Sequence, residues 1–284
     1  MTRHLPGYGW IGMLTMLVSE AGMLAGVPPF AVWHTPIAWT GYVLFIDALV
    51  WKRRGSSWIR NAPAELFFLA CASVPIWVIF EIYNKYFIRN WYYVGLPDVL
   101  LVRYVGYVWA FATILPAIFE TADLVSSVRD RRAPHYRSDE PPPQPLTPAM
   151  WIVMAIGAMM LVVPIAYPST YLAAPVWLGF IFLLDPLNAR ARDESILSDW
   201  RAGHTGRLIN LLIAGLLCGV IWECWNYWAT AKWIYNVPIF PTIKLFEMPV
   251  AGFLGFPPFA VECFVMFVAV RRWVWTGGRR PIAV

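Results

Sequence analysis

The segment IFEIYNKYFIRNWYY at residues 79–93 returns as IWECWNYWATAKWIY at residues 221–235, an offset of 142 positions. The match extends in both directions. Upstream, WTGYVLFIDALVWKRRGSSWI at residues 39–59 aligns with WLGFIFLLDPLNARARDESIL at residues 177–197, and downstream the offset of 142 continues without a gap. Self-similarity of this length predicts two related halves built on one design.

The composition is that of a membrane protein. Hydrophobic residues make up 59% of the 284 residues, charged residues only 14%, and mean hydropathy is +0.56. Long apolar stretches recur, each a candidate to cross about 30 Å of hydrocarbon as a helix. They are residues 9–27, 35–51, 64–88, 105–128, 149–167, 173–188, 207–230 and 247–270, of which the second and sixth are short. The sequence therefore predicts an all-α integral membrane protein with about eight transmembrane helices and the lipid bilayer as its partner.

The predicted helices divide into two parallel tandem repeats of four. Residues 1–128 form the first four-helix membrane repeat and residues 149–284 the second. Because each repeat holds an even number of helices, both run in the same direction and are related by an axis along the membrane normal. Residues 129–148 include APHYRSDEPPPQPLTP, a Pro-rich polar segment that predicts an exposed cytoplasmic linker.

The basic residues predict the orientation. Seventeen of the 22 Lys and Arg residues fall at the termini or in loops that this threading places on one side, which is the pattern of a cytoplasmic side. The other five lie near helix ends on the opposite side, where a long side chain snorkels to water. They are Lys85, Arg89, Arg103, Lys232 and Lys244. We expect the bacterial cytoplasmic (inner) membrane, both termini in the cytoplasm and no nucleic-acid partner.

Carboxylates inside predicted spans are the first candidates for function, because an ionisable group there is costly. An E-x-x-N pattern places Glu81 with Asn84, and Glu223 with Asn226, on one helix face. The carboxyl and amide of a pair can touch one ligand or each other. We expect the Glu residues to be catalytic acids and the Asn residues to orient them.

Further acidic residues occur in matched positions of the two halves. Glu120 and Glu262 lie deeper, each on a helix with an internal proline, and are predicted catalytic partners in a polar pocket. The alternative is a structural hydrogen bond between the third and fourth helices of each half. Asp47 and Asp185 come just before arginine-rich loops, so a salt bridge at the cytoplasmic end is expected there.

Aromatic side chains surround the E-x-x-N pattern, and Tyr83, Trp91, Trp225 and Trp233 are predicted to bind substrate. Their ring faces stabilise a cation. The alternative is an interfacial belt at head-group depth. No metal or cofactor is expected, because all four histidines lie outside the predicted spans and the sequence has no P-loop, aspartate-rich diphosphate motif or nucleophile elbow.

Each half resembles the lycopene cyclase domain of carotenoid biosynthesis, over about residues 45–128 and 183–270. The resemblance rests on four short motifs, Phe80-Glu81, Trp222-Glu223, Trp91-Tyr92-Tyr93 and Trp233-Ile234-Tyr235. Glu stands where the family has Asp after an aromatic residue. The family's Pro-x-Glu-Glu has no clear match, unless Glu247-Met248-Pro249 is a degenerate form of it. The resemblance implies an isoprenoid-handling fold and a cyclase, or isomerase, activity.

Three functions are compatible with these features. The first is a membrane enzyme that acts on a long isoprenoid or carotenoid by acid-catalysed protonation of a double bond, as a cyclase or hydratase does. The second is a non-catalytic transmembrane subunit that scaffolds a larger membrane complex or binds a pigment, quinone or lipid. The third is a small-molecule transporter, for which parallel repeats and midplane carboxylates are typical.

Overall fold

The computed structural model describes residues 3–129 and 145–284, so most of the predicted linker at 129–148 lies outside the described residues. The part before the gap contains α1 (Gly7–Leu24), α2 (Phe30–Arg54), α3 (Trp58–Asn61), α4 (Pro63–Tyr83), a π-helical turn (Asn84–Ile88), β1 (Trp91–Val94) and α5 (Leu100–Arg129). The part after it contains α6 (Pro148–Ala166), a 3-10 turn (Thr170–Leu172), α7 (Ala173–Arg190), α8 (Ile196–Arg201), α9 (Gly206–Trp228), β2 (Lys232–Tyr235), β3 (Lys244–Leu245), β4 (Met248–Pro249), a second 3-10 turn (Val250–Gly255) and α10 (Phe256–Val274).

Six helical segments of the described residues are long and apolar enough to cross a membrane, and the chain is accordingly an all-α integral membrane protein. They are Pro63–Ile88, Leu100–Arg129, Pro148–Ala166, Thr170–Arg190, Gly206–Trp228 and Val250–Val274. Helices α1 and α2 are not among the six, although they are 18 and 25 residues long. Helix α2 exceeds the predicted 35–51 because it continues towards its N-terminus through a kink at Trp33.

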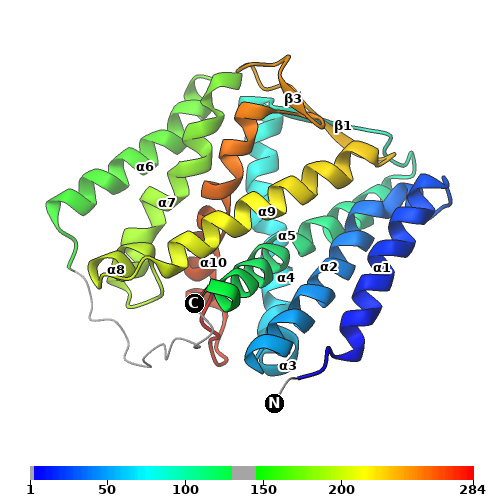
Figure 1. The fold of residues 1–284 in the computed structure, drawn as a ribbon. Coiled ribbons are helices and arrows are strands. Elements are labelled where there is room, and N and C mark those ends of the chain that lie inside the picture. The colour runs from blue at the N-terminus through cyan, green and yellow to red at the C-terminus, as the bar shows by residue number, and fades with distance from the viewer. Residues whose placement is uncertain (1–2, 130–144) are drawn as a thin grey trace.

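Helices α4, α5, α9 and α10 form the centre of the bundle, with α1 and α2 on one flank and α6 and α7 on the other (Figure 1). The two parts of the chain join where α5 packs against α9 and α4 against α10. Phe119 of α5, and Phe264 and Phe267 of α10, are among the largest fully buried side chains. The core therefore lies between helices of both parts.

Each flanking helix pair packs through glycines. A Cβ atom at Gly12 of α1 would lie 2.5 Å from the carbonyl oxygen of Gly41 in α2, and one at Gly157 of α6 would lie 2.8 Å from that of Gly179 in α7. Both distances are too short for a side chain. Small residues of this kind let membrane helices approach closely enough for backbone contact.

A two-stranded antiparallel ribbon, made of β1 and β2, joins the two parts at one end of the bundle, whereas the start of α1 and the C-terminus lie towards the opposite end (Figure 1). In its register Tyr92 faces Ile234 at the centre, with Trp91 opposite Tyr235 and Tyr93 opposite Trp233. The ribbon therefore places aromatic side chains from both parts of the chain next to one another.

A buried ion-pair network closes the opposite end of the bundle. Arg271 of α10 is 1% exposed and lies 3.1 Å from Glu65 of α4 and 2.5 Å from Glu194. The backbone N–H of Arg280 also donates to Glu65, at 2.7 Å. Burial of both charges makes the loss of either partner costly.

Asp47 and Asp185 have a different role from the expected salt bridge. Asp47 accepts the backbone N–H of Ile59 at 2.9 Å, and Asp185 accepts those of Ile196 and Leu197 at 2.9 and 2.8 Å. Each carboxylate thus satisfies free N–H groups in the first turn of a short helix, α3 or α8. The helix needs this acceptor because its first N–H groups have no partner within the helix.

Candidate functional site

A cavity of about 550 Å³ lies between the two parts of the chain and against the ribbon, within the size range of pockets that enclose a small-molecule ligand. Side chains from α2, α4, α5, α7, α9, α10 and the ribbon line it, and most are apolar or aromatic. Seven tryptophans belong to this lining, namely Trp33, Trp39, Trp77, Trp91, Trp177, Trp222 and Trp233. The cavity thus offers flat, apolar walls.

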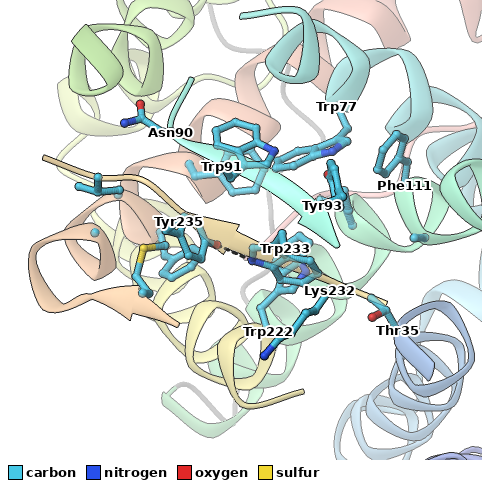
Figure 2. A pocket seen from close by; sticks show the side chains of 18 of the residues that line it. Thr35, Trp77, Asn90, Trp91, Tyr93, Phe111, Trp222, Lys232, Trp233 and Tyr235 are labelled. Atoms are coloured by element: carbon cyan, nitrogen blue, oxygen red, sulfur yellow. Dashed lines mark hydrogen bonds between the residues drawn. The ribbon is translucent and has the colours of Figure 1, made fainter. Parts of the chain in front are cut away.

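The tryptophan rings from the two parts of the chain contact one another across the cavity wall (Figure 2). The ring centroid of Trp77 lies 6.0 Å from that of Trp91 and 6.1 Å from that of Trp222, with interplanar angles of 28° in both cases. Trp39 lies 5.4 Å from Trp222. Offset contacts of this kind stabilise the wall itself.

Glu81 lies behind this wall and is held by three donors. Its Oε1 atom accepts hydrogen bonds from Trp77 Nε1 at 2.9 Å, Trp91 Nε1 at 3.3 Å and Tyr93 Oη at 2.5 Å. All three donor residues line the cavity, whereas Glu81 itself does not. Glu81 therefore has no direct contact with the cavity, because Trp77, Trp91 and Tyr93 lie between the carboxylate and the cavity.

Glu223 has a matching set with one donor fewer. It is fully buried and accepts hydrogen bonds from Tyr235 Oη at 2.7 Å and Trp233 Nε1 at 3.4 Å. The residue four positions earlier is Gly219, so no tryptophan on α9 corresponds to Trp77. The second oxygen, Oε2, is buried and has no hydrogen-bond partner among the described residues.

The two ribbon tyrosines keep their protons. Burial raises the pKa of Tyr93 and of Tyr235 well above the usual value, and the neighbouring carboxylates of Glu81 and Glu223 raise it further. Both phenols are therefore neutral O–H donors at physiological pH. Each one lines the cavity on one side and contacts a carboxylate on the other.

Asn84 and Asn226 do not orient the glutamates. Asn84 Nδ2 donates to the carbonyl of Trp91 at 2.8 Å, and its Oδ1 accepts the N–H groups of Trp91 and Asn90 at 3.0 and 2.8 Å. Asn226 makes the corresponding pair of bonds with Trp233, at 2.8 and 2.9 Å. The amides are occupied by backbone, so they fix the strands that carry the tryptophans and tyrosines.

Glu120 and Glu262 are not brought to this site. Both are fully buried, and neither lines the cavity. Glu120 lies beside Asp47, and Glu262 accepts the backbone N–H of Phe180 at 3.1 Å. Among the described residues no hydrogen bond joins either one to Glu81 or Glu223, so the expected catalytic partnership has no geometric basis.

Of the four aromatic residues expected to bind substrate, Trp91 and Trp233 line the cavity. Tyr83 instead donates to the carbonyl of Leu161 at 3.0 Å, and Trp225 packs against Trp39 with ring centroids 5.0 Å apart. Neither Tyr83 nor Trp225 belongs to the described lining. Trp225 supports the wall from behind through Trp39, whereas the Tyr83 hydrogen bond connects α4 to α6.

Sequence reasoning missed Trp39 and Trp177, which line the cavity from α2 and α7. A signal was present, because the internal alignment pairs these two residues with each other. It also missed Trp77, which lies four residues before Glu81 and hence on the same helix face. Its indole reaches that carboxylate directly.

No family model, curated protein or solved structure matches this chain. Within residues 3–129 and 145–284, no group of three or more His, Cys, Asp or Glu side chains is arranged to hold a metal ion. The polar side chains at the site include the carboxylates of Glu81 and Glu223, the phenols of Tyr93 and Tyr235 and the tryptophan indoles.

Proposed function

We propose that the protein is a membrane enzyme that binds a long isoprenoid, such as a carotenoid, in the aromatic cavity and protonates one of its carbon–carbon double bonds. The observation that carries the proposal is the pair of phenols, Tyr93 and Tyr235, each of which faces the cavity and hydrogen-bonds a buried glutamate. Each phenol thus connects a glutamate behind the aromatic wall to the surface of an apolar pocket.

The proton moves in a relay. When Glu223 is protonated, its hydrogen bond with Tyr235 is reversed, so that the carboxyl O–H donates to the phenol oxygen and the phenol O–H is free to face the cavity. The carboxyl group then gives its proton to the Tyr235 hydroxyl while that hydroxyl gives its own proton to an alkene carbon. The alkene π bond breaks, a C–H bond forms, and a carbocation and a carboxylate remain. The carboxylate recovers its proton when the cation loses one from a neighbouring carbon, as in a cyclase, or when water adds, as in a hydratase.

The tryptophans stabilise the carbocation. Ring faces attract a cation within about 6 Å of the ring centroid, and Trp77, Trp222 and Trp233 surround the space beside the phenols. The same walls bury the hydrocarbon chain and exclude water. Glu81 and Tyr93 form a second relay of the same composition on the other strand of the ribbon.

A non-catalytic role is the second candidate, because neither glutamate lines the cavity and Oε1 of Glu81 is already bound by three donors. In that case the carboxylates anchor the aromatic wall, and the protein is a subunit that binds a pigment, quinone or lipid. The two candidates differ in whether a proton reaches the ligand.

Turnover in D₂O tests the proposal. The ligand is first identified by mass spectrometry of an organic-solvent extract of the purified protein, with a gel of co-purifying proteins, and is then incubated with protein in D₂O. An enzyme places deuterium on carbon, so the product gains about one mass unit for each protonation.

Tyr235→Phe and Glu223→Gln should abolish the gain. Tyr227→Phe is the control, because Tyr227 lies on α9, the helix that carries Glu223, but outside the described lining. This variant should retain the gain in mass. A ligand that emerges unlabelled from the wild type overturns the enzyme proposal and leaves the binding role.

The architecture belongs to the same proposal: eight spans in two parallel repeats, with both termini on the cytoplasmic side of a bacterial inner membrane. Its support is the matched hydrogen bonding at an offset of 142, in which Asn84 and Asn226 bind the backbone of Trp91 and Trp233. The ribbon register fits an axis through its centre, since Tyr92 faces Ile234 at the same offset. Cysteine labelling from each side of sealed vesicles tests the orientation.

A further inference from the structure

The charge on the cavity lining is all of one sign. Arg103 and Lys232 are the charged residues of the described lining, and no acidic residue belongs to it. Both lie near the end of the ribbon at which β1 finishes and β2 begins. Lys232 lies opposite Val94, the last residue of β1, and Arg103 binds the carbonyl of Pro97 just beyond it. The other end of the ribbon contributes the neutral Asn90.

Lys232 already has a counter-ion. Its Nζ atom lies 2.6 Å from Glu247 and also donates to the backbone carbonyl of Tyr227 at 3.2 Å. This pair is electrically neutral, so Lys232 adds little net charge to the cavity. Figure 2 shows its position at the start of its strand, beside the aromatic wall.

Arg103 differs from Lys232 in this respect. Its Nε atom donates to the Pro97 carbonyl at 2.9 Å, which fixes the guanidinium at the cavity wall. Among the described residues no ion pair includes Arg103, and this bond uses one of its five N–H donors. The terminal nitrogens of a guanidinium form the flat fork that binds a phosphate or carboxylate through two hydrogen bonds.

We propose that the bound isoprenoid carries an anionic head group, a phosphate or a carboxylate, which Arg103 binds at this end of the cavity while the chain lies against the tryptophans. This inference rests on the proposed function and narrows it from isoprenoids in general to acidic ones. A neutral hydrocarbon would use none of the remaining N–H donors of Arg103, which is half-buried at the cavity wall, and would gain nothing from its charge.

A snorkelling side chain is the plain alternative for Arg103, as the sequence alone suggests. Snorkelling places the charge in water at the membrane surface, as expected of Lys244, which is exposed on β3. Arg103 instead lines a cavity and is tied to a backbone carbonyl. Lys244 therefore serves as the matched control.

The test compares two ligands that differ only in the head group, geranylgeraniol and geranylgeranyl phosphate, by quenching of tryptophan fluorescence in detergent. The wild type should bind the phosphate about tenfold to a hundredfold more tightly than the alcohol. Arg103→Gln should bring the phosphate to the affinity of the alcohol and leave the alcohol unchanged. Lys244→Gln should match the wild type, and inorganic phosphate should compete only weakly, since it lacks the chain.

The outcomes separate the two proposals. Equal wild-type affinity for both ligands, or a preference for the phosphate that survives in Arg103→Gln, overturns the head-group inference while leaving an isoprenoid-binding cavity. Failure of both ligands to bind overturns the proposed function as well. Strong competition by inorganic phosphate alone would mean that Arg103 binds a free anion, which also contradicts the inference.

Discussion

Replacing Asn84 by alanine should loosen the ribbon and lower the melting temperature substantially. Asn84 is 5% exposed and makes three hydrogen bonds to the backbone of Asn90 and Trp91. At about 1 kcal/mol each, their loss lowers the free energy of unfolding by about 3 kcal/mol. The same reasoning gives about 2 kcal/mol for Asn226→Ala, which loses the two bonds to Trp233.

Thermal unfolding of the detergent-solubilised protein, followed by tryptophan fluorescence, measures this effect. At about 2–4 °C per kcal/mol, Asn84→Ala should lower Tm by about 6–12 °C, and Asn226→Ala by about 4–8 °C. The control is Asn236→Ala, just past β2, where the side chain is exposed and the backbone bond to Asn90 remains. It should stay within about 2 °C of the wild type. Equal shifts for Asn84→Ala and Asn236→Ala would refute the bracing role, and lost turnover with an unchanged Tm would restore the role of orienting Glu81.

Two further predictions concern stability. Glu65→Gln removes one of the two carboxylates that pair with buried Arg271 and leaves Glu194 as its remaining partner, so the free energy of unfolding should fall by about 1–3 kcal/mol; a Tm equal to that of the wild type would contradict this. The pKa values of Tyr93 and Tyr235 are raised in the folded state. Their contribution to the free energy of unfolding is therefore complete below about pH 10, where tyrosine in the unfolded chain begins to ionise, and it decreases as the pH rises further. Unfolding measured from pH 8 to pH 11 should show this decline, and the Tyr93→Phe, Tyr235→Phe double variant should show a smaller one. An identical decline in both proteins would contradict the raised pKa values of the two tyrosines.

Helices were predictable from the sequence where length and apolar character agree. A run of about 20 apolar residues has few alternatives in a bilayer, since every backbone group must find a partner within the segment. The start of α2 at Phe30 was missed because His34 and Pro36 interrupt its apolar pattern. His34 is buried and hydrogen-bonds Ser19 of α1 at 3.0 Å, a tertiary contact that hydropathy does not reveal.

The candidate site was predictable only in its residue types. Matched Glu, Trp and Tyr positions were visible in the internal alignment, and they do meet at the ribbon. The hydrogen-bond partners of Asn84 could not be predicted from the sequence. Its spacing from Glu81 is the same whether the amide binds that carboxylate or the backbone of a strand seven residues further along the chain. The placement of Glu120 away from the cavity likewise depends on how α5 packs, which spacing along one helix does not determine.

The central claim is that the aromatic cavity holds an isoprenoid, and native mass spectrometry of the purified protein tests it most directly. Ala110 lines the cavity from α5, and a tryptophan there fills part of the space without adding charge. The wild type should carry one bound isoprenoid that organic extraction releases, and Ala110→Trp should be folded and free of it. A wild type with no bound isoprenoid after expression beside an isoprenoid pathway, or equal occupancy in Ala110→Trp, would contradict the account.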